Sequence, residues 1–268
     1  LKVLVLSFYT SSPHLNSIGR LIEDIVSLGN TECLEFFISP PPTDPPGSEI
    51  ENGQEFMAFS RAYPVAFSWL TRLRLEYHAF GHSDITDLIS TCGRLRHLSL
   101  RFCRMLDLDS TLKIDVPCSE LQEIEFIGLL CTRIELVSVP KLRQVVCYRW
   151  HMENPPVRFG YVPELRGVML SSKAKVWQEP FALSECLSRS ARNLSTLTLC
   201  FEGQMVNLIS SHHLNMYLLH LHIIIHLLYQ LKLCIYVLAA DLDSARTPEA
   251  AHSYIQKPDH CVSSRYLQ

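Results

Sequence analysis

The sequence lacks the short motifs that mark the common classes of enzyme. It contains no GxSxG, HExxH, GxxxxGK[ST] or GxGxxG segment, and these motifs carry nucleophiles, zinc ligands or phosphate-binding loops. His82, Ser83 and Asp84 are consecutive, but the members of a catalytic triad must converge in space, which adjacent residues rarely do. Asp84 is better explained as the N-cap of a helix. We therefore expect no catalytic residue, no cofactor and no enzymatic activity.

Signals for metal ions and nucleic acids are missing as well. No CxxC pair is present, although such pairs are typical of structural zinc sites. Asp107 and Asp109 are spaced like calcium ligands, but the glycine and the glutamate that complete a calcium loop are absent. The net charge of -3 does not supply the basic face that nucleic-acid-binding proteins use. We expect neither a metal site nor a nucleic-acid partner.

We expect no signal peptide, and the cysteines do not indicate a secreted disulfide scaffold. Of the ten cysteines, Cys103, Cys147 and Cys200 occupy apolar positions of the repeat described below, where a free thiol packs as a small hydrophobic side chain. This usage predicts a location in the cytoplasm or nucleus. Leu1 stands where an initiator methionine would be, so we expect that an upstream part is missing.

What the sequence does contain is a repeated leucine pattern. The segment "LRHLSLRFC" at 95–103 follows LxxLxLxxC, and "LKVLVL", "LTRLRL", "LQEIEF", "LRQVVC", "LRGVML" and "LSTLTL" keep its three apolar positions, while "TECLEF" keeps two. The copies that start at 70, 95, 121, 142, 165 and 194 are 25, 26, 21, 23 and 29 residues apart. Leucine-rich repeats recur every ~20–29 residues. The pattern predicts an α/β leucine-rich-repeat solenoid with a parallel concave sheet, followed by a non-repeat apolar tail.

Composition divides the chain into four regions. They are N-terminal repeats at 1–38, a proline-rich insertion loop at 39–66, the main repeat region at 67–205 and a non-repeat tail at 206–268. The loop prediction depends on "SPPPTDPPGSEIENGQ", whose five prolines disfavour both helix and sheet.

Apolar periodicity places helices between some of the strands. The segments at 15–30, ending at Gly29, at 84–92 and at 181–193 have apolar residues at roughly helical spacing. The links "IELVSVPKL" and "FGYVPEL" contain proline and lack this spacing. We expect the outer face to be flatter there.

The tail has two competing explanations. Residues 213–240 form an almost continuous apolar segment, long enough as a helix to cross a bilayer, which would make the protein tail-anchored. Histidines, Gln230 and Lys232 within it would be costly at membrane depth, so we do not expect a membrane partner. The repeat stops at Met205, and the codons of Val206 and Asn207 can spell the start of an intron. The tail is therefore interpreted as a translated intron or a helix.

The repeat region resembles a known family. The segments "RAYPVAFSWLTRLRL", "HSDITDLISTCGRLRHLSLRFC", "LKIDVPCSELQEIEFIG", "RIELVSVPKLRQVVC" and "NPPVRFGYVPEL" are together similar to the plant F-box/leucine-rich-repeat proteins, particularly their grass group. The resemblance implies repeats that present a protein substrate to a Skp1-cullin-F-box ubiquitin ligase. No F-box-like segment precedes the repeats, so a Skp1-type adaptor is an expected partner only if an F-box lies upstream. The alternative is a free-standing or truncated repeat protein with no ligase role.

Alternate strand positions of such a solenoid point away from the core, and they can be assigned from the repeat. The columns are Arg72, His97, Glu123, Gln144 and Gly167; Arg74, Ser99, Glu125, Val146 and Met169; and Glu76, Arg101, Ile127, Tyr148 and Ser171. The predicted partner-binding residues on this concave face are Arg72, Arg74, Glu76, His97, Ser99, Arg101, Glu123, Glu125, Gln144 and Tyr148. The face changes from charged to apolar, which suits a protein surface anchored by arginine and tyrosine. The alternative is that the charges only pair across neighbouring strands.

Overall fold

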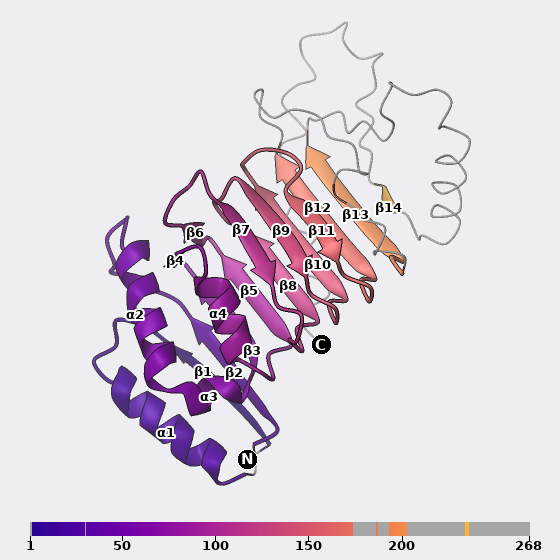
Figure 1. The fold of residues 1–268 in the computed structure, drawn as a ribbon. Helices are drawn as coiled ribbons and strands as arrows, with labels where there is room; N and C mark the ends of the chain where they lie inside the picture. The colour runs from indigo at the N-terminus through magenta and orange to yellow at the C-terminus, as the bar shows by residue number, and fades with distance from the viewer. Residues whose placement is uncertain (1, 30, 174–185, 187–192, 203–233, 236–268) are drawn as a thin grey trace, which may run out of the picture. The chain divides into compact units, whose positions relative to one another are not determined.

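A computed structural model of the chain describes residues 2–29, 31–173, 186, 193–202 and 234–235. Its main element is a nine-stranded sheet in the order β1-β2-β3-β5-β8-β10-β12-β13-β14, in which every neighbouring pair is parallel (Figure 1). The strands are β1 Val3–Phe8, β2 Cys33–Ile38, β3 Leu70–Glu76, β5 His97–Arg101, β8 Glu123–Ile127, β10 Gln144–Trp150, β12 Gly167–Lys173, β13 Thr196–Glu202 and β14 Cys234–Ile235. The chain is a parallel β-solenoid, as the repeat predicts.

The register of the sheet agrees with the repeat. The first two predicted columns are confirmed by the pairs Arg72–His97–Glu123–Gln144–Gly167 and Arg74–Ser99–Glu125–Val146–Met169. The third column is confirmed from Glu76 to Tyr148. Its last step is wrong, because Tyr148 and Ser171 do not form a one-to-one pair. Because Arg149 has a left-handed backbone (φ 57°), the register shifts between Cys147 and Trp150, a β-bulge that the repeat spacing does not reveal.

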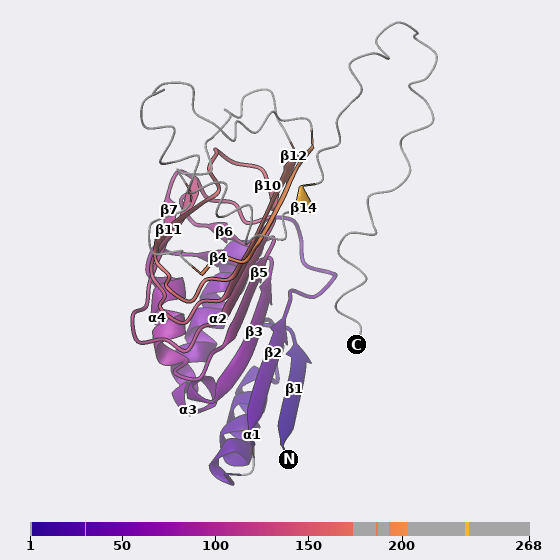
Figure 2. The same cartoon turned by 90° about the vertical axis from the view of Figure 1, so that its right-hand side faces the viewer.

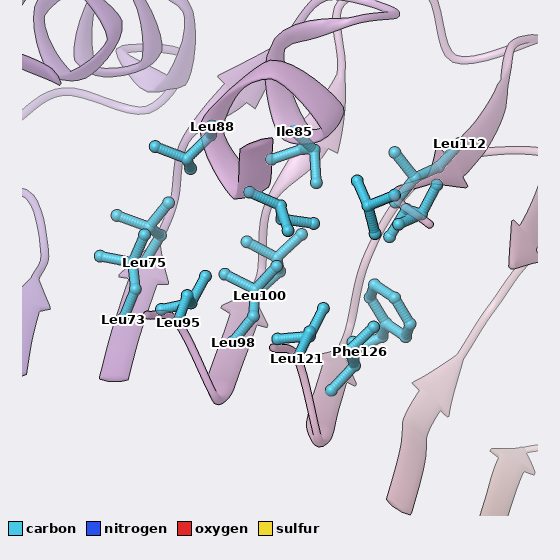
Figure 3. Close-up of a cluster of buried hydrophobic side chains, with 14 of the residues drawn as sticks. Leu73, Leu75, Ile85, Leu88, Leu95, Leu98, Leu100, Leu112, Leu121 and Phe126 are labelled. Carbon is cyan, nitrogen blue, oxygen red and sulfur yellow. The ribbon is translucent and has the colours of Figure 1, made fainter. Parts of the chain in front are cut away.

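The core lies on one side of this sheet and is built from the apolar positions of the repeat. Leu95, Leu98 and Leu100 are at most 1% exposed. Figure 3 shows Leu98 and Leu100 in a row with the leucines of the neighbouring turns, with Ile85 and Leu88 above them. Burying one such side chain contributes about 1.5–3 kcal/mol. The stacked turns therefore share one continuous apolar core.

The outer layer begins with helices. They are α1 Leu15–Ser27, α2 Glu49–Ala62, α3 Pro64–Ser68 and α4 Asp84–Thr91, and Figure 2 shows them on one side of the sheet. The predicted helices at 15–30 and 84–92 are confirmed. Helix α1 ends as expected, because Gly29 takes a left-handed backbone (φ 74°) and its N–H donates to the carbonyl of Val26 over 3.0 Å. Helix α4 begins at Asp84 rather than being capped by it, since Ser83 is the N-cap residue.

The predicted insertion loop at 39–66 is wrong beyond Ser48. Helix α2 starts at Glu49, after Pro46, Gly47 and the N-cap residue Ser48, and it has Glu49 and Glu51 in its first turn, where carboxylates stabilise the positive end of a helix. Phe56 and Phe59 on α2 are nearly inaccessible and each packs edge-on against Phe67 of α3. The apolar contacts of the core thus order a segment that its composition marks as a loop.

The outer layer also contains strands. These strands are β4 Ala79–Phe80, β6 Arg104–Met105, β7 Thr111–Asp115, β9 Arg133–Ser138 and β11 Val157–Tyr161, and the last three form a parallel sheet in the order β11-β9-β7. Alternation explains them: Leu112, Ile134 and Val157 are buried and in register, with polar residues between the buried positions. The flatter outer face predicted for the proline-containing links is confirmed.

Two predictions lie outside the described residues. The helix expected at 181–193 is one, since only 186 and 193 of it are described. The apolar segment at 213–240 is the other, apart from Cys234 and Ile235, which form β14 beside β13. Both explanations of the tail therefore stay predictions.

Candidate protein-binding face

The ten predicted partner-binding residues lie on one face of the main sheet. They occupy alternate positions of β3, β5, β8 and β10, and all of their side chains are half-buried or exposed. Their backbones are brought into adjacent ladder positions by the register described above. We call this surface the ladder face. In Figure 2 no labelled helix lies on that side of the sheet.

Charged residues on the ladder face are paired with one another at its N-terminal end. Arg72 lies 4.0 Å from Glu35 of β2. Arg74 and Glu76 form an ion pair along the same strand, with the Arg74 Nε donating to Glu76 over 2.8 Å. All four side chains remain 22–45% exposed, so solvent screens both pairs and each contributes little to stability.

The next two strands carry a cross-strand network. His97 Nδ1 donates to Glu123 over 3.0 Å, and this hydrogen bond lowers the pKa of Glu123, with partial burial opposing it. Glu125 accepts from the Ser99 hydroxyl at 2.9 Å and from Arg101 at 3.5 Å. Arg72, Arg101, Glu123 and Glu125 thus pair across neighbouring strands, as the alternative predicts, with Glu35, Glu125, His97 and Arg101 as their respective partners. These pairs hold the side chains of the face in position, but they do not identify what the face binds.

The ladder face becomes apolar toward β10 and β12. Ile127, Val146, Tyr148 and Met169 replace the charges of the preceding strands, and all four are half-buried rather than covered. Their columns continue those of Arg101 and Glu125. A partner that crosses the strands would therefore meet ion pairs first and an apolar surface with one tyrosine afterwards.

Sequence reasoning missed a row of residues at the carboxyl ends of the same strands. Tyr77, Phe102, Gly128 and Arg149 lie where β3, β5 and β8 end and where β10 bulges, and each has a left-handed backbone, with φ of 57°, 50°, 61° and 57°. We call them the edge row. Gly128 was the only signal in the sequence, because glycine alone adopts this conformation without cost. The identities of Tyr77, Phe102 and Arg149 give no signal of a left-handed backbone.

No metal centre is found among the described residues, where no group of three or more His, Cys, Asp or Glu side chains could hold an ion. An open hollow of about 450 Å³ beside α2 is lined by residues that include Asp44, Glu51 and Glu55.

Burial raises the pKa of the Cys103 thiol to about 12, so this cysteine is a core side chain rather than a nucleophile. Asp84 accepts a hydrogen bond from the Gly81 N–H at 2.7 Å, which is a structural role at the start of α4.

In the described part of the chain, no helix is long and apolar enough to span a bilayer. No protein-family model matches the chain, and no curated protein and no solved structure matches it either.

Proposed function

We propose that this chain is a protein-interaction module of the leucine-rich-repeat type, and that the ladder face holds a protein partner. The observation that supports the proposal most is the unbroken set of parallel strands whose outward positions run from ion pairs to an apolar surface in register. A partner can lie across several strands at once on such a surface. Paired charges at one end and a half-buried tyrosine at the other suit a protein better than a small molecule.

We further propose, from the resemblance to plant F-box/leucine-rich-repeat proteins, that the partner is a substrate of a Skp1-cullin-F-box ubiquitin ligase. In this proposal the ladder face selects the substrate and an F-box elsewhere in the polypeptide recruits the adaptor. A second candidate is a repeat protein that binds its partner without a ligase. The same surface serves both roles, and only the adaptor separates them.

The experiment is a quantitative co-purification from source cells that express the tagged full-length protein. Val146→Arg places a long cation in the apolar part of the ladder face, and Val137→Arg is the matched control. Val137 lies on β9 in the outer sheet and is 42% exposed, so an arginine there is accommodated in solvent. Partners of the ladder face should be lost with the first variant and retained with the second.

The adaptor gives the second result of the same experiment. A Skp1-type adaptor that co-purifies with the wild type and with both variants supports the ligase role, because the adaptor is expected to bind outside the repeats. Partners without any adaptor support the free-standing role. Partners that survive Val146→Arg as well as they survive Val137→Arg would contradict binding by the ladder face.

A further inference from the structure

The edge row is held in place by a repeated hydrogen bond. The Tyr77 N–H donates to the carbonyl of Arg101 over 3.0 Å, the Phe102 N–H to Ile127 over 2.7 Å, and the Gly128 N–H to Tyr148 over 2.8 Å. Left-handed backbones are uncommon for bulky residues. Strain of this kind persists where surrounding contacts enforce it, and it concentrates at functional sites. The row therefore lies at the carboxyl edge of the sheet as a fixed element rather than a loose loop.

The left-handed backbones bring aromatic rings side by side along this edge. The rings of Tyr77 and Phe102 are stacked, 5.2 Å apart between centroids and 18° from parallel. Tyr77 is still 43% exposed. Such a stack offers a flat apolar surface to a ligand without any further ordering of side chains.

A guanidinium group completes the row. Arg149 is exposed, and its Cζ lies 6.0 Å from the Phe102 ring and 5.8 Å from the Tyr148 ring. Gly128 stands between β5 and β10, and a Cβ added there would lie 2.8 Å from the Phe102 ring. The glycine thus keeps the space beside Phe102 open. Two aromatic rings hold the cation by its weakly hydrated faces and leave its N–H groups for another acceptor.

Arg149 differs from the arginines of the ladder face in its ion pairing. Arg72, Arg74 and Arg101 each face a glutamate. Among the residues that the structure describes, Arg149 takes part in no ion pair. The edge row therefore carries an exposed positive charge without a carboxylate partner, next to a stacked pair of aromatic rings.

We propose that the edge row binds an extended peptide segment of the partner protein in which a carboxylate lies next to an aromatic or aliphatic side chain. Arg149 takes the carboxylate through paired N–H groups, and the Tyr77–Phe102 stack takes the apolar side chain. This inference rests on the proposed interaction function and names the chemistry of its anchor. A nucleic acid fits less well, because Glu76, Glu123 and Glu125 on the adjoining face repel phosphates. A small ligand fits less well because the row is an exposed edge.

The test is a selection from a random-peptide display library against the full chain. The retained peptides should be enriched in aspartate or glutamate next to an aromatic or aliphatic residue. Affinity for Arg149→Gln should fall by about tenfold, since a charge-assisted bidentate contact is lost. Arg158→Gln is the matched control, because Arg158 is an exposed arginine on β11 of the outer sheet, and it should leave affinity unchanged.

Each other outcome overturns a defined part of the proposal. Retained peptides without a carboxylate, or peptides that bind Arg149→Gln as tightly as wild type, would refute the edge row as a carboxylate site. If those peptides are lost with Val146→Arg instead, binding by the ladder face stands and only the edge row fails. If no peptide is retained by the wild-type chain, the edge row fails as a peptide site. The co-purification then decides the proposed function by itself.

Discussion

His78 makes the folded protein sensitive to acid in a way that can be measured. The side chain is fully buried, lies edge-on to Phe56 and stacks on Phe80 at 6.1 Å. Its Nδ1 is 2.6 Å from the carbonyl oxygen of Glu76, so this nitrogen carries the proton and donates it. The other nitrogen, Nε2, is buried and has no hydrogen-bond partner within the described part of the chain. A second proton would bind to Nε2, and the N–H group formed there would lack a hydrogen-bond acceptor among the described residues.

The size of the effect follows from the pKa. Burial lowers the pKa of His78 from 6.5 to about 4, against a smaller opposing effect of the Glu76 carbonyl. Well above pH 6.5 His78 is neutral in both the folded and the unfolded chain, so its titration costs the folded state no stability there. As pH falls from 6.5 to about 4 only the unfolded chain takes up the proton, and the folded state loses stability. At about 1.4 kcal/mol for each pKa unit, the loss is roughly 3 kcal/mol.

The assay is urea unfolding of the wild type and of His78→Gln at a series of pH values from about 7 to about 4.5. Carboxylates titrate in both proteins, so the informative quantity is the difference between their free energies of unfolding. That difference should move in favour of the variant by roughly 2–3 kcal/mol across the series. His82→Gln changes an exposed histidine of the same turn and should follow the wild type. A difference between His78→Gln and wild type that stays constant with pH would refute the reasoning.

Three further predictions concern packing and thiol chemistry. Leu100→Ala should cost about 2–5 kcal/mol of unfolding free energy, measured by urea titration, because Leu100 is fully buried in the shared core; a cost below about 1 kcal/mol would contradict the packing. Gly53→Ala should cost about 1–3 kcal/mol, because its Cβ would overlap the backbone of β4, whereas Gly93→Ala, with open space around it, should be nearly neutral in the same assay. Cys118 is exposed and Cys103 buried, so mass spectrometry after alkylation of the native protein should find Cys118 modified and Cys103 protected, and equal labelling would contradict the fold.

The repeat pattern was sufficient to predict the sheet and its ladder face. Leucine spacing determines which residues of consecutive turns align, so the pairs Arg72–His97 and Arg74–Ser99 follow from the sequence alone. The pattern failed at Arg149, where a bulge adds one residue to β10. Backbone conformation at a single arginine leaves no trace in hydrophobic periodicity.

Helix α2 and the edge row were missed for different physical reasons. The buried face of α2 includes Asn52, Gly53 and Ser60 beside its phenylalanines, so its apolar residues do not show a helical spacing. The edge row requires left-handed backbones at Tyr77 and Phe102, which local propensity opposes. Hydrogen bonds from neighbouring turns impose that conformation, and such contacts are visible only once the turns are stacked.

Binding of a protein by the ladder face is tested most directly by site-specific photo-crosslinking in cells. A photoreactive residue placed at Tyr148, on the apolar end of the ladder face, is compared with one at Tyr161, which lies on β11 in the outer sheet and is 56% exposed. Binding by the ladder face predicts discrete crosslinked partners from position 148 and none above background from position 161. Crosslinks from position 161 alone, or from neither position, would contradict it.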